Sequence, residues 1–313
     1  MDKMPFVSVV LPSYNEAKNV VPVYQSLIKV LENEAQLRLE IIFVDDGSAD
    51  NTAETVEALS QKDPRVKLIQ LFRNFGHQNA LTAGIAKASG DVIITMDSDL
   101  QHPAETIKEM LAKYQEGNDV VYTVRLGGQK GFLKNLSSSL FYKVFNNLTG
   151  MNISKDSSDF RLISRKVADN LNVMREKNRF LRGMTPWIGG RCATVEYVAN
   201  PRLHGKPSYT WKKSLMLAVA GLLSFSTLPL KIIFFIGVLC CAVSLGSGIY
   251  IICHKIFIGT ALPGYTDIIV SILFLNGLQF VFLGIIGRFL VVVLDEIRDR
   301  PNYIIRRTIG IEK

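Results

Sequence analysis

Two aspartates separated by one residue, Asp97 and Asp99, are the first candidates for chemistry in this chain. They follow the β-branched run DVIITM, and Gln101 lies two residues further on. Carboxylate and amide oxygens suit a hard divalent cation such as Mg²⁺ or Mn²⁺, which shares its ligands with a substrate diphosphate. The pair therefore predicts a metal–diphosphate site, although Asp-x-Asp also occurs in solvated loops. His102 is a poorer ligand candidate, because these ions prefer oxygen.

A second acidic pair, Asp45 and Asp46, follows the apolar run EIIFV and precedes Gly47 and Ser48. Its carboxylates could accept hydrogen bonds from the N–H and O–H groups of a nucleotide base and ribose. The alternative is a plain turn that starts a helix, with Gly47 at the turn and Asp50 as the cap. The residue types leave both interpretations open.

Repeated apolar runs indicate the elements that must position these carboxylates. The runs alternate with helical patterns, at 6–11, 40–44, 66–71, 91–96 and 119–124 for the runs and roughly 16–35, 51–61, 77–88 and 103–116 for the helices. Such alternation predicts an α/β fold with a mostly parallel sheet covered on both faces. Ligands bind beyond the carboxyl ends of the strands in these sheets. Polar clusters occur at those ends, at 13–16, 45–48, 73–76 and 97–99.

Apolar character is concentrated near the C-terminus. The uncharged runs 232–253 and 268–287 are each long enough to cross a bilayer as a helix. Lys and Arg residues flank the pair on both sides, which places both flanks in the cytoplasm. Buried core helices are the less favoured alternative. We therefore predict a multi-pass protein of the cytoplasmic (inner) membrane with both termini cytoplasmic. Its parts would be a cytoplasmic domain over 1–227, a transmembrane domain over 228–294 with spans at about 229–254 and 266–292, and a cytoplasmic tail over 295–313.

Two other segments have patterns typical of helices at a membrane surface. A Phe- and Lys-rich amphipathic helix is expected at about 131–149, where a core-facing helix is an equal alternative. An apolar segment at about 212–226 is too short to span and is expected to lie at the interface.

The composition, 48% apolar and 20% charged, excludes a disordered chain, and 4 Cys are too few for a disulfide scaffold. The net charge of +8 suits membrane topology and phosphate binding, so nucleic acid is not expected as a partner.

Several motifs occur together at family-like spacings. They are Pro12-x-Tyr14-Asn15-Glu16, Asp45-Asp46-Gly47-Ser48, Arg73-Asn74-Phe75-Gly76, Asp97-x-Asp99-Leu100-Gln101, Asp159-Phe160-Arg161-Leu162, Arg179-Phe180-x-Arg182-Gly183 and Arg300-Pro301-x-Tyr303. With these motifs the chain resembles family 2 glycosyltransferases of the GT-A fold over nearly its whole length. It is most similar to the polyprenyl-phosphate glycosyltransferases, the group of dolichol-phosphate mannose synthases and bactoprenol glucosyltransferases, and within them to the bactoprenol branch.

The resemblance implies roles for individual residues. Asp159 and Asp99 would be catalytic, and Mg²⁺ or Mn²⁺ would be held by Asp97, Asp99 and Gln101. The nucleotide-sugar pocket would be lined by Pro12, Tyr14, Glu16, Asp46, Asp97 and Ser98. Phosphate and acceptor would be bound by Arg125, Arg182, Arg202 and Ser208. For Asp159 the alternative is a structural salt bridge to Arg161 or Arg165.

The activity implied is inverting, metal-dependent transfer of glucose from UDP-glucose to undecaprenyl phosphate at the cytoplasmic membrane face. The lipid-linked sugar would serve modification of cell-envelope glycans such as lipopolysaccharide. Alternatives are the same reaction with GDP-mannose or another UDP-sugar, or a non-catalytic membrane scaffold or flippase subunit. A processive synthase is disfavoured, because its usual Gln-x-x-Arg-Trp motif is absent from the sequence. The lipid bilayer is an expected partner, and a homo-oligomer such as a tetramer is a family-level expectation.

The chain departs from the family pattern at two places. His102-Pro103-Ala104 stands where Asp-Pro-Pro is usual, and Arg288 stands where an acidic residue is usual. The second departure puts in doubt any headgroup or intersubunit role of that position. Deletion of residues 228–313 is predicted to spare nucleotide binding and to abolish transfer to long-chain acceptors.

Overall fold

The computed structural model describes residues 5–32, 37–126, 157–177, 179–201 and 264–311, with separate helical residues between 233 and 257. The chain forms two compact units. One comprises Met1–Ser214 with Pro301–Lys313, and the other comprises Leu215–Arg300. The predicted interfacial helices at 131–149 and 212–226 lie outside the described residues.

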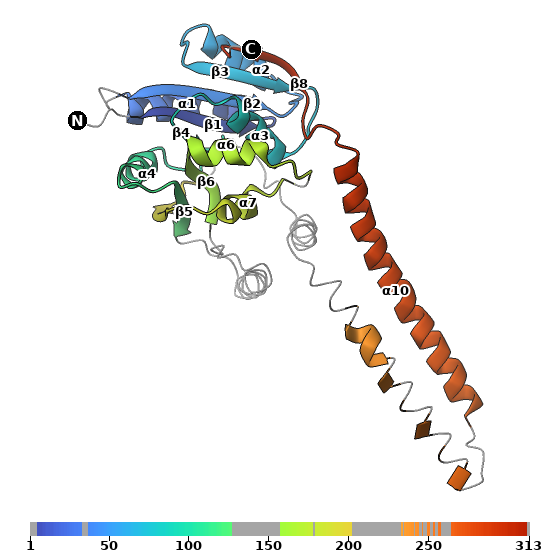
Figure 1. Ribbon diagram of the computed structural model, residues 1–313. Helices are drawn as coiled ribbons and strands as arrows, with labels where there is room; N and C mark the ends of the chain where they lie inside the picture. The colour runs from blue at the N-terminus through green and yellow to red at the C-terminus, as the bar shows by residue number, and fades with distance from the viewer. Residues whose placement is uncertain are drawn as a thin grey trace. The chain divides into compact units, whose positions relative to one another are not determined.

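An eight-stranded sheet organises the first unit, in the order β7-β5-β6-β4-β1-β2-β3-β8 (Figure 1). Parallel pairing joins β1 to β2 and β4, β2 to β3, and β5 to β7, whereas β6 and β8 pair antiparallel. The strands are β1 Phe6–Ser13, β2 Arg38–Asp45, β3 Val66–Leu71, β4 Val92–Thr95, β5 Val120–Leu126, β6 Ser157–Ser164, β7 Cys192–Val198 and β8 Ile305–Ile309. The predicted mostly parallel α/β sheet is confirmed, and β1 to β5 coincide with the five predicted runs.

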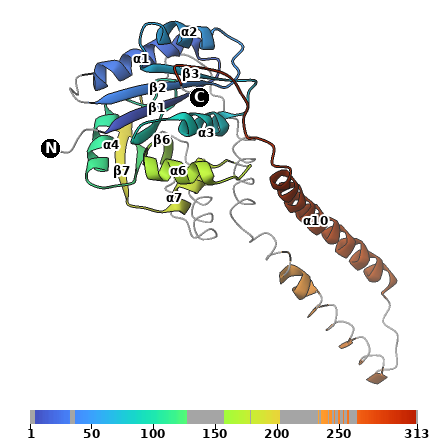
Figure 2. The same cartoon turned by 45° about the horizontal axis from the view of Figure 1, so that its top comes forward.

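Helices cover both faces of this sheet (Figure 2). They are α1 Ala17–Leu31, α2 Thr52–Ser60, α3 His77–Lys87, α4 Thr106–Gln115, α6 Arg165–Val173 and α7 Leu181–Ile188. Buried side chains of α1, α2 and α4 share one core with Val7, Val9 and Leu11 of β1. On the other face α3 contacts β1 and β2, and α6 and α7 contact β6. Gly84 lets α3 approach closely, since a Cβ there would lie 2.2 Å from Cγ1 of Val10.

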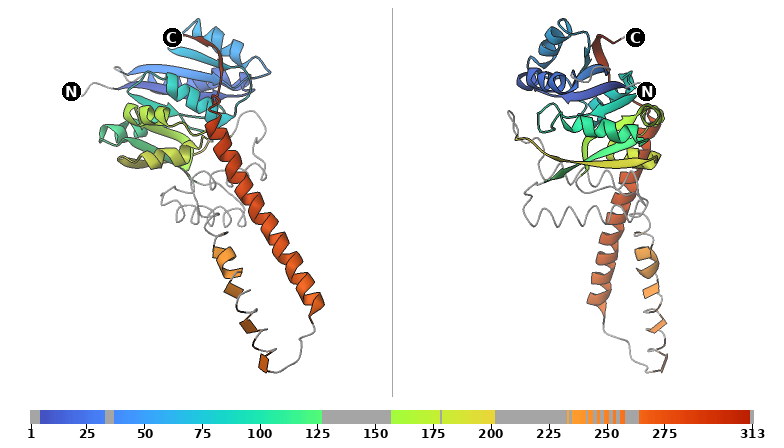
Figure 3. Two further views of the ribbon diagram at one scale, coloured as in Figure 1. Left: turned by 45° about the vertical axis from the view of Figure 1, so that its right-hand side comes forward. Right: turned by 90° about the vertical axis from the view of Figure 1, so that its left-hand side faces the viewer.

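The strand β8 was not predicted; its segment was expected only as a tail. It runs antiparallel to β3, with Leu68 opposite Ile309 and Gln70 opposite Arg307. The N–H of Phe72 extends the pairing to the carbonyl of Ile304 at 3.0 Å. Figure 3 shows this C-terminal strand beside the N-terminal part of the fold. Deletion of 228–313 would therefore also remove an edge strand of the sheet, so that deletion cannot isolate the membrane contribution.

The second unit contains the helix α10, Tyr265–Ile297, which is 33 residues long. By length and composition its segment Phe274–Ile297 is apolar enough to cross a membrane, and it is the one such helix among the residues that the structure describes. It overlaps the predicted span at about 266–292. Most of the predicted span at about 229–254 lies outside the described residues, so the two-span arrangement stays a prediction.

Candidate active site

The loops that follow β1, β2 and β4 are tied to one another at the carboxyl edge of the sheet. The N–H of Asp46 donates to the carbonyl of Ser13 at 2.9 Å. The N–H of Asn15 donates to Oγ of Ser48 at 2.9 Å. The hydroxyl of Ser98 donates to the carbonyl of Pro12 at 2.9 Å. The structure thus brings together the polar clusters that the sequence placed at separate strand ends.

Asp46 joins the loop after β3 to this edge. Its carboxylate accepts hydrogen bonds from the N–H groups of Phe75 at 2.7 Å and Gly76 at 2.9 Å. Burial raises the pKa of Asp46, and these two hydrogen bonds act in the opposite direction. Gly47 permits the contact, because a Cβ on it would lie 2.4 Å from the carbonyl carbon of Arg73. The predicted contact of Asp46 with a nucleotide would therefore add to an existing positioning role.

Asp97 and Asp99 differ in exposure. The Asp97 side chain is 38% exposed at the end of β4, whereas Asp99 is buried at 5%. Asp99 Oδ1 accepts a hydrogen bond from the N–H of Gln101 at 3.1 Å. Leu100, between Asp99 and Gln101, adopts a left-handed conformation with a φ of 63°. This sharp turn sets the two carboxylates and the Gln101 amide on one short loop.

The donor set of this loop is compatible with a divalent cation. Oxygen ligands dominate it, as Mg²⁺ and Mn²⁺ prefer. Among the described residues no group of three or more His, Cys, Asp and Glu side chains is arranged as a metal site. An ion held by this loop would therefore need further ligands, such as substrate phosphates, because the described side chains do not form an all-protein cage.

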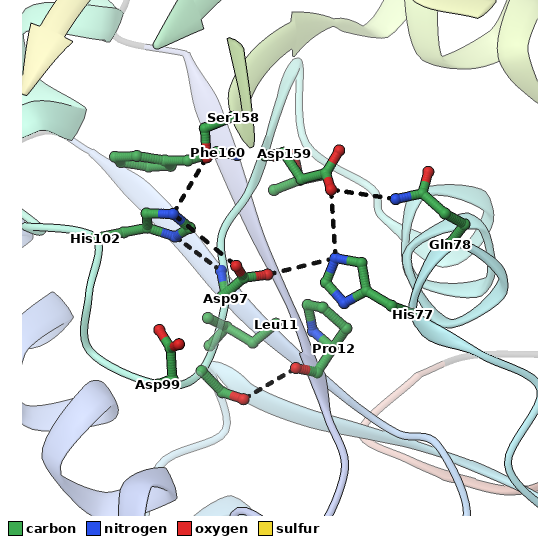
Figure 4. A network of polar contacts seen from close by, with 12 residues as sticks. Leu11, Pro12, His77, Gln78, Asp97, Asp99, His102, Ser158, Asp159 and Phe160 are labelled. Carbon is green, nitrogen blue, oxygen red and sulfur yellow. Dashed lines mark hydrogen bonds and ion pairs between the residues drawn. The ribbon is translucent and has the colours of Figure 1, made fainter. Parts of the chain in front are cut away.

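Two histidines flank Asp97 from opposite sides (Figure 4). His102 accepts a hydrogen bond at Nδ1 from the N–H of Asp97, at 3.1 Å. Its ring stacks on Phe160 with centroids 4.8 Å apart and meets Tyr197 edge-on at 5.6 Å. His102 is 6% exposed. These contacts make it a support for the loop.

His77, at the start of α3, lies between the two acidic groups of the site. Its Nε2 is 3.4 Å from Oδ1 of Asp97 and 3.7 Å from Oδ2 of Asp159. Burial disfavours the charged imidazole, but Asp97 and Asp159 outweigh it and raise the pKa of His77 to about 9. Sequence reasoning did not select His77. The available signal was its position directly after the polar cluster 73–76, at the start of a predicted helix.

Asp159, on β6, is the centre of a buried ionic network. Arg182 of α7 binds both its oxygens, through Nε at 2.9 Å and Nη2 at 2.8 Å. Arg161 donates to Oδ1 at 2.9 Å, and Gln78 of α3 donates to Oδ2 at 3.2 Å. Burial opposes ionisation, but Arg182, His77 and Arg161 hold the pKa of Asp159 well below its usual range. Asp159 is therefore a carboxylate at neutral pH.

The salt-bridge alternative for Asp159 is partly observed. Arg161 does pair with it, while Arg165 instead donates to the carbonyls of Ala88 and Gly90. The observed partner Arg182 had been predicted as a phosphate-binding residue. Its side chain is 32% exposed, so it keeps a face toward solvent while it holds Asp159.

The other predicted site residues lie at varied places. Tyr14 is 48% exposed on the loop after β1, and Glu16 accepts a hydrogen bond from the side chain of Asn19. Arg125 is exposed near the end of β5. Arg202 and Ser208 lie outside the described residues.

Residues 8–171 match the family described as Glycosyl transferase family 2. The chain belongs to this family. As a family 2 member it is a glycosyltransferase, and the matched range contains the loops after β1 to β4 and most of the Asp159 network.

Close relatives match over nearly the whole chain. A protein of Bacillus subtilis (strain 168) named "Uncharacterized glycosyltransferase YkcC" is 39% identical, over 97% of this chain and 94% of its own. The Escherichia coli (strain K12) "Prophage bactoprenol glucosyl transferase homolog" is 38% identical, over 96% and 98%. The "Bactoprenol glucosyl transferase" of Shigella phage SfII is 36% identical, over 96% and 98%. These matches extend well beyond the family 2 domain, through α10.

Proposed function

We propose that this glycosyltransferase moves glucose from UDP-glucose to a polyprenyl phosphate at a membrane surface. The observation that carries the proposal is the similarity to proteins named bactoprenol glucosyl transferase, at 36–38% identity over 96% of the chain. The apolar segment of α10 supports it, because a lipid acceptor keeps its tail in the bilayer. The acidic loop at the carboxyl edge of β4 supports a nucleotide-diphosphate donor.

The donor pocket that we propose lies over the loops after β1, β2 and β4. Its residues would be Pro12, Tyr14, Glu16, Asp46, Asp97 and Ser98. Asp97, Asp99 and Gln101 would hold Mg²⁺ or Mn²⁺, which when bound neutralises charge on the leaving diphosphate. The partly exposed carboxylate of Asp97, which lies 3.4 Å from Nε2 of His77, would bind such an ion, while the buried Asp99 braces the turn.

The nucleophile in this proposal is an oxygen of the lipid phosphate. A phosphomonoester has a second pKa of about 6, so the oxygen is ionised at neutral pH and requires no strong general base. Asp159 already accepts hydrogen bonds from Arg161 and Arg182. It would therefore orient the acceptor and stabilise positive charge that develops on the sugar. Arg182 would share its guanidinium between Asp159 and the acceptor phosphate. A single displacement would invert the anomeric centre, giving a β-linked product from an α-linked donor.

The membrane arrangement is proposed with the activity. Two spans would place residues 1–227 and the C-terminal tail in the cytoplasm, where nucleotide sugars are available. Labelling of single cysteines placed at residue 3 and in the connector 254–267 of a variant without its native cysteines tests this topology from either side of the membrane. Labelling of both positions from the same side would contradict it. A homo-oligomer stays a prediction from the resemblance.

The activity is tested with the full-length enzyme in proteoliposomes that contain undecaprenyl phosphate. Radiolabelled UDP-glucose, GDP-mannose and UDP-N-acetylglucosamine are supplied in turn, with and without Mg²⁺ or Mn²⁺. We expect label to enter the lipid from UDP-glucose and only with a metal. Transfer from another donor alone would refute the glucose assignment, and no transfer from any donor would refute the proposed reaction.

A further inference from the structure

A hydrogen-bonded chain leads from the C-terminal strand to the loops of the proposed donor pocket. It begins at Arg307 in β8. Its Nε donates to Oε1 of Gln70 in β3 at 2.8 Å, and its Nη2 is 2.9 Å from Oε2 of Glu57 in α2. Figure 1 shows β8, β3 and α2 gathered at one end of the sheet. Arg307 thus connects β8 to both the neighbouring strand and the helix that covers it.

Gln70 passes this contact on to the strand β2. Its Nε2 donates to Oδ2 of Asp45 at 3.1 Å. The guanidinium of Arg307 can only donate and the carboxylate of Asp45 can only accept, so the side chain between them must do both. The amide of Gln70 can do both in one orientation, with its oxygen toward Arg307 and its nitrogen toward Asp45. A carboxylate at position 70 would face Asp45 with two acceptors and no donor.

Asp45 in turn holds the loops after β2 and β1. Its Oδ1 accepts from the N–H of Ser48 at 3.0 Å, and it is 1% exposed. Ser48 Oγ accepts from the N–H of Asn15, whose own Oδ1 accepts from the N–H of Ala49 at 2.8 Å. Asn15 has a φ of 57°, a left-handed conformation that persists only where its surroundings impose it. Tyr14 and Glu16, proposed to contact the donor, are its immediate neighbours.

We infer that Arg307 and Gln70 are positioning residues for the nucleotide-sugar donor, acting through Asp45 and Ser48 on the loop at Asn15. The inference rests on the proposed function, because it assumes that this loop binds the donor. In this arrangement the donor pocket is complete only when the strand that follows α10 is docked. Residues beyond position 300 then contribute to donor affinity, although the carboxylates that we place at the reaction all lie before position 160.

The test exploits the polarity of the Gln70–Asp45 hydrogen bond. Gln70→Glu keeps the contact with Arg307 but sets two carboxylates against each other, and Asp45→Asn alone leaves two amides that cannot satisfy both Arg307 and Ser48. The double variant Gln70→Glu/Asp45→Asn reverses the bond, since the amide introduced at position 45 would donate to the carboxylate introduced at position 70 and accept from Ser48. Arg307→Met removes the origin of the chain. Arg306→Met is the matched control, because Arg306 carries the same charge in β8 and its side chain forms no ion pair or hydrogen bond with the described residues.

Full-length variants are compared in proteoliposomes by KM for UDP-glucose, kcat at saturating donor and thermal midpoint. We expect Gln70→Glu and Arg307→Met to raise KM about tenfold, the scale of one charge-assisted hydrogen bond, with kcat within about twofold. The double variant should recover a KM near that of the wild type, and Arg306→Met should leave it unchanged. A merely structural contact would lower the thermal midpoint and the active fraction without moving KM.

The outcomes separate the two ideas. If the wild type binds and uses the donor while Gln70→Glu and Arg307→Met keep its KM, the positioning role is wrong and the proposed function stands. If the double variant is no better than Gln70→Glu, the chain through Asp45 is likewise refuted. If the wild type shows neither binding nor turnover of UDP-glucose in isothermal titration and transfer assays, the proposed function falls, and the positioning role falls with it.

Discussion

The backbone N–H of Asp97 donates a hydrogen bond to Nδ1 of His102 at 3.1 Å. An acceptor at Nδ1 places the proton of the neutral ring on Nε2, which lies 3.2 Å from Oγ of Ser158. Stacking on Phe160 fixes the plane of the ring. Asp97 is thus held by a residue that departs from the usual family pattern. A histidine here serves the loop as a hydrogen-bond acceptor, and it needs no contact with a metal.

Two substitutions of His102 separate its roles. His102→Asn keeps an acceptor oxygen near the position of Nδ1, whereas His102→Phe keeps the stacking on Phe160 and removes the acceptor. We expect His102→Phe to raise the half-saturating Mn²⁺ concentration by about tenfold or more, the usual scale for residues that orient metal ligands. His102→Asn should change it far less. Metal titrations of transfer activity measure both, and equal effects of the two variants would contradict the acceptor role.

In the Asp159 network, substitution of Asp159 and substitution of Arg182 should have different effects on stability. Arg161 is 3% exposed, so Asp159→Asn would leave its charge buried without an ionised partner and should cost about 3–5 kcal/mol of stability. Arg182 is about one-third exposed, and Arg161 and His77 would still face Asp159 without it, so Arg182→Met should cost less stability than Asp159→Asn and still reduce transfer strongly. Denaturant unfolding and transfer assays are compared for the two variants.

Arg165→Met provides the control, because Arg165 contacts backbone carbonyls at the far end of β6 and does not reach Asp159. It should leave the donor KM unchanged. Full transfer activity of a folded Arg182→Met enzyme would rule out a role for Arg182 in the reaction.

The sequence predicts the first five strands because their pattern is local. Runs such as FVSVVL and DVIITM are apolar and β-branched, and each ends in a polar cluster. The strand β6 was not predicted, since SSDFRLIS buries Asp159 and Arg161 on one face. Their burial depends on partners in α3 and α7, which no local pattern reveals. β8 has the sequence IRRTI, and only pairing with β3, more than 230 residues earlier, makes it a strand.

The candidate site shows the same limit. Topology was enough to bring Asp46, Asp97 and Ser98 to one edge of the sheet. It did not show that both oxygens of Asp46 bind the loop after β3, nor that His77 lies between Asp97 and Asp159. Such contacts depend on side-chain directions and on the register between strands, which a single sequence does not specify.

Substitution of Gly47 by a residue with a Cβ should disturb the donor loops. It has a φ of 69°, and a Cβ would lie 2.4 Å from the backbone of Arg73. Gly47→Ala should cost about 1–2 kcal/mol for the dihedral angle, and the clash would displace the loop after β3. Gly117→Ala is the control, since Gly117 has a φ of 89°, the one atom within 4 Å of its Cβ position is Nη1 of Arg191 at 3.4 Å, and it lies in the turn between α4 and β5, outside the donor loops. We expect donor binding to weaken much more in Gly47→Ala; similar binding in both variants would contradict this.

Asp63 predicts a pH-dependent contribution to stability outside the site. Hydrogen bonds from Arg65 outweigh burial and lower the pKa of Asp63 in the folded state. The stabilisation is therefore present above the unfolded pKa of about 3.9 and is lost as pH falls through the folded pKa. In urea unfolding, the difference in free energy of unfolding between the wild type and Asp63→Asn should be largest at pH 7 and should shrink toward pH 3. Asp169→Asn, which breaks an exposed pair, should show little difference at either pH. A constant gap for Asp63→Asn would refute the argument.

Asp99→Ala is expected to abolish transfer while the protein stays folded. Asp99 is buried, braces the Gln101 turn and is one of two carboxylates proposed to share a cation with the donor diphosphate. Loss of charge neutralisation worth several kcal/mol corresponds to a fall in kcat of about 10² to 10³. EDTA should reproduce the loss in the wild type, and Mg²⁺ or Mn²⁺ should reverse it there but not in the variant. Asp91→Asn is the control, because Asp91 caps the opposite end of the β4 run through the N–H of Phe6. Near-normal turnover of folded Asp99→Ala would show that this loop does not carry the metal. Another positive charge would then have to neutralise the leaving diphosphate.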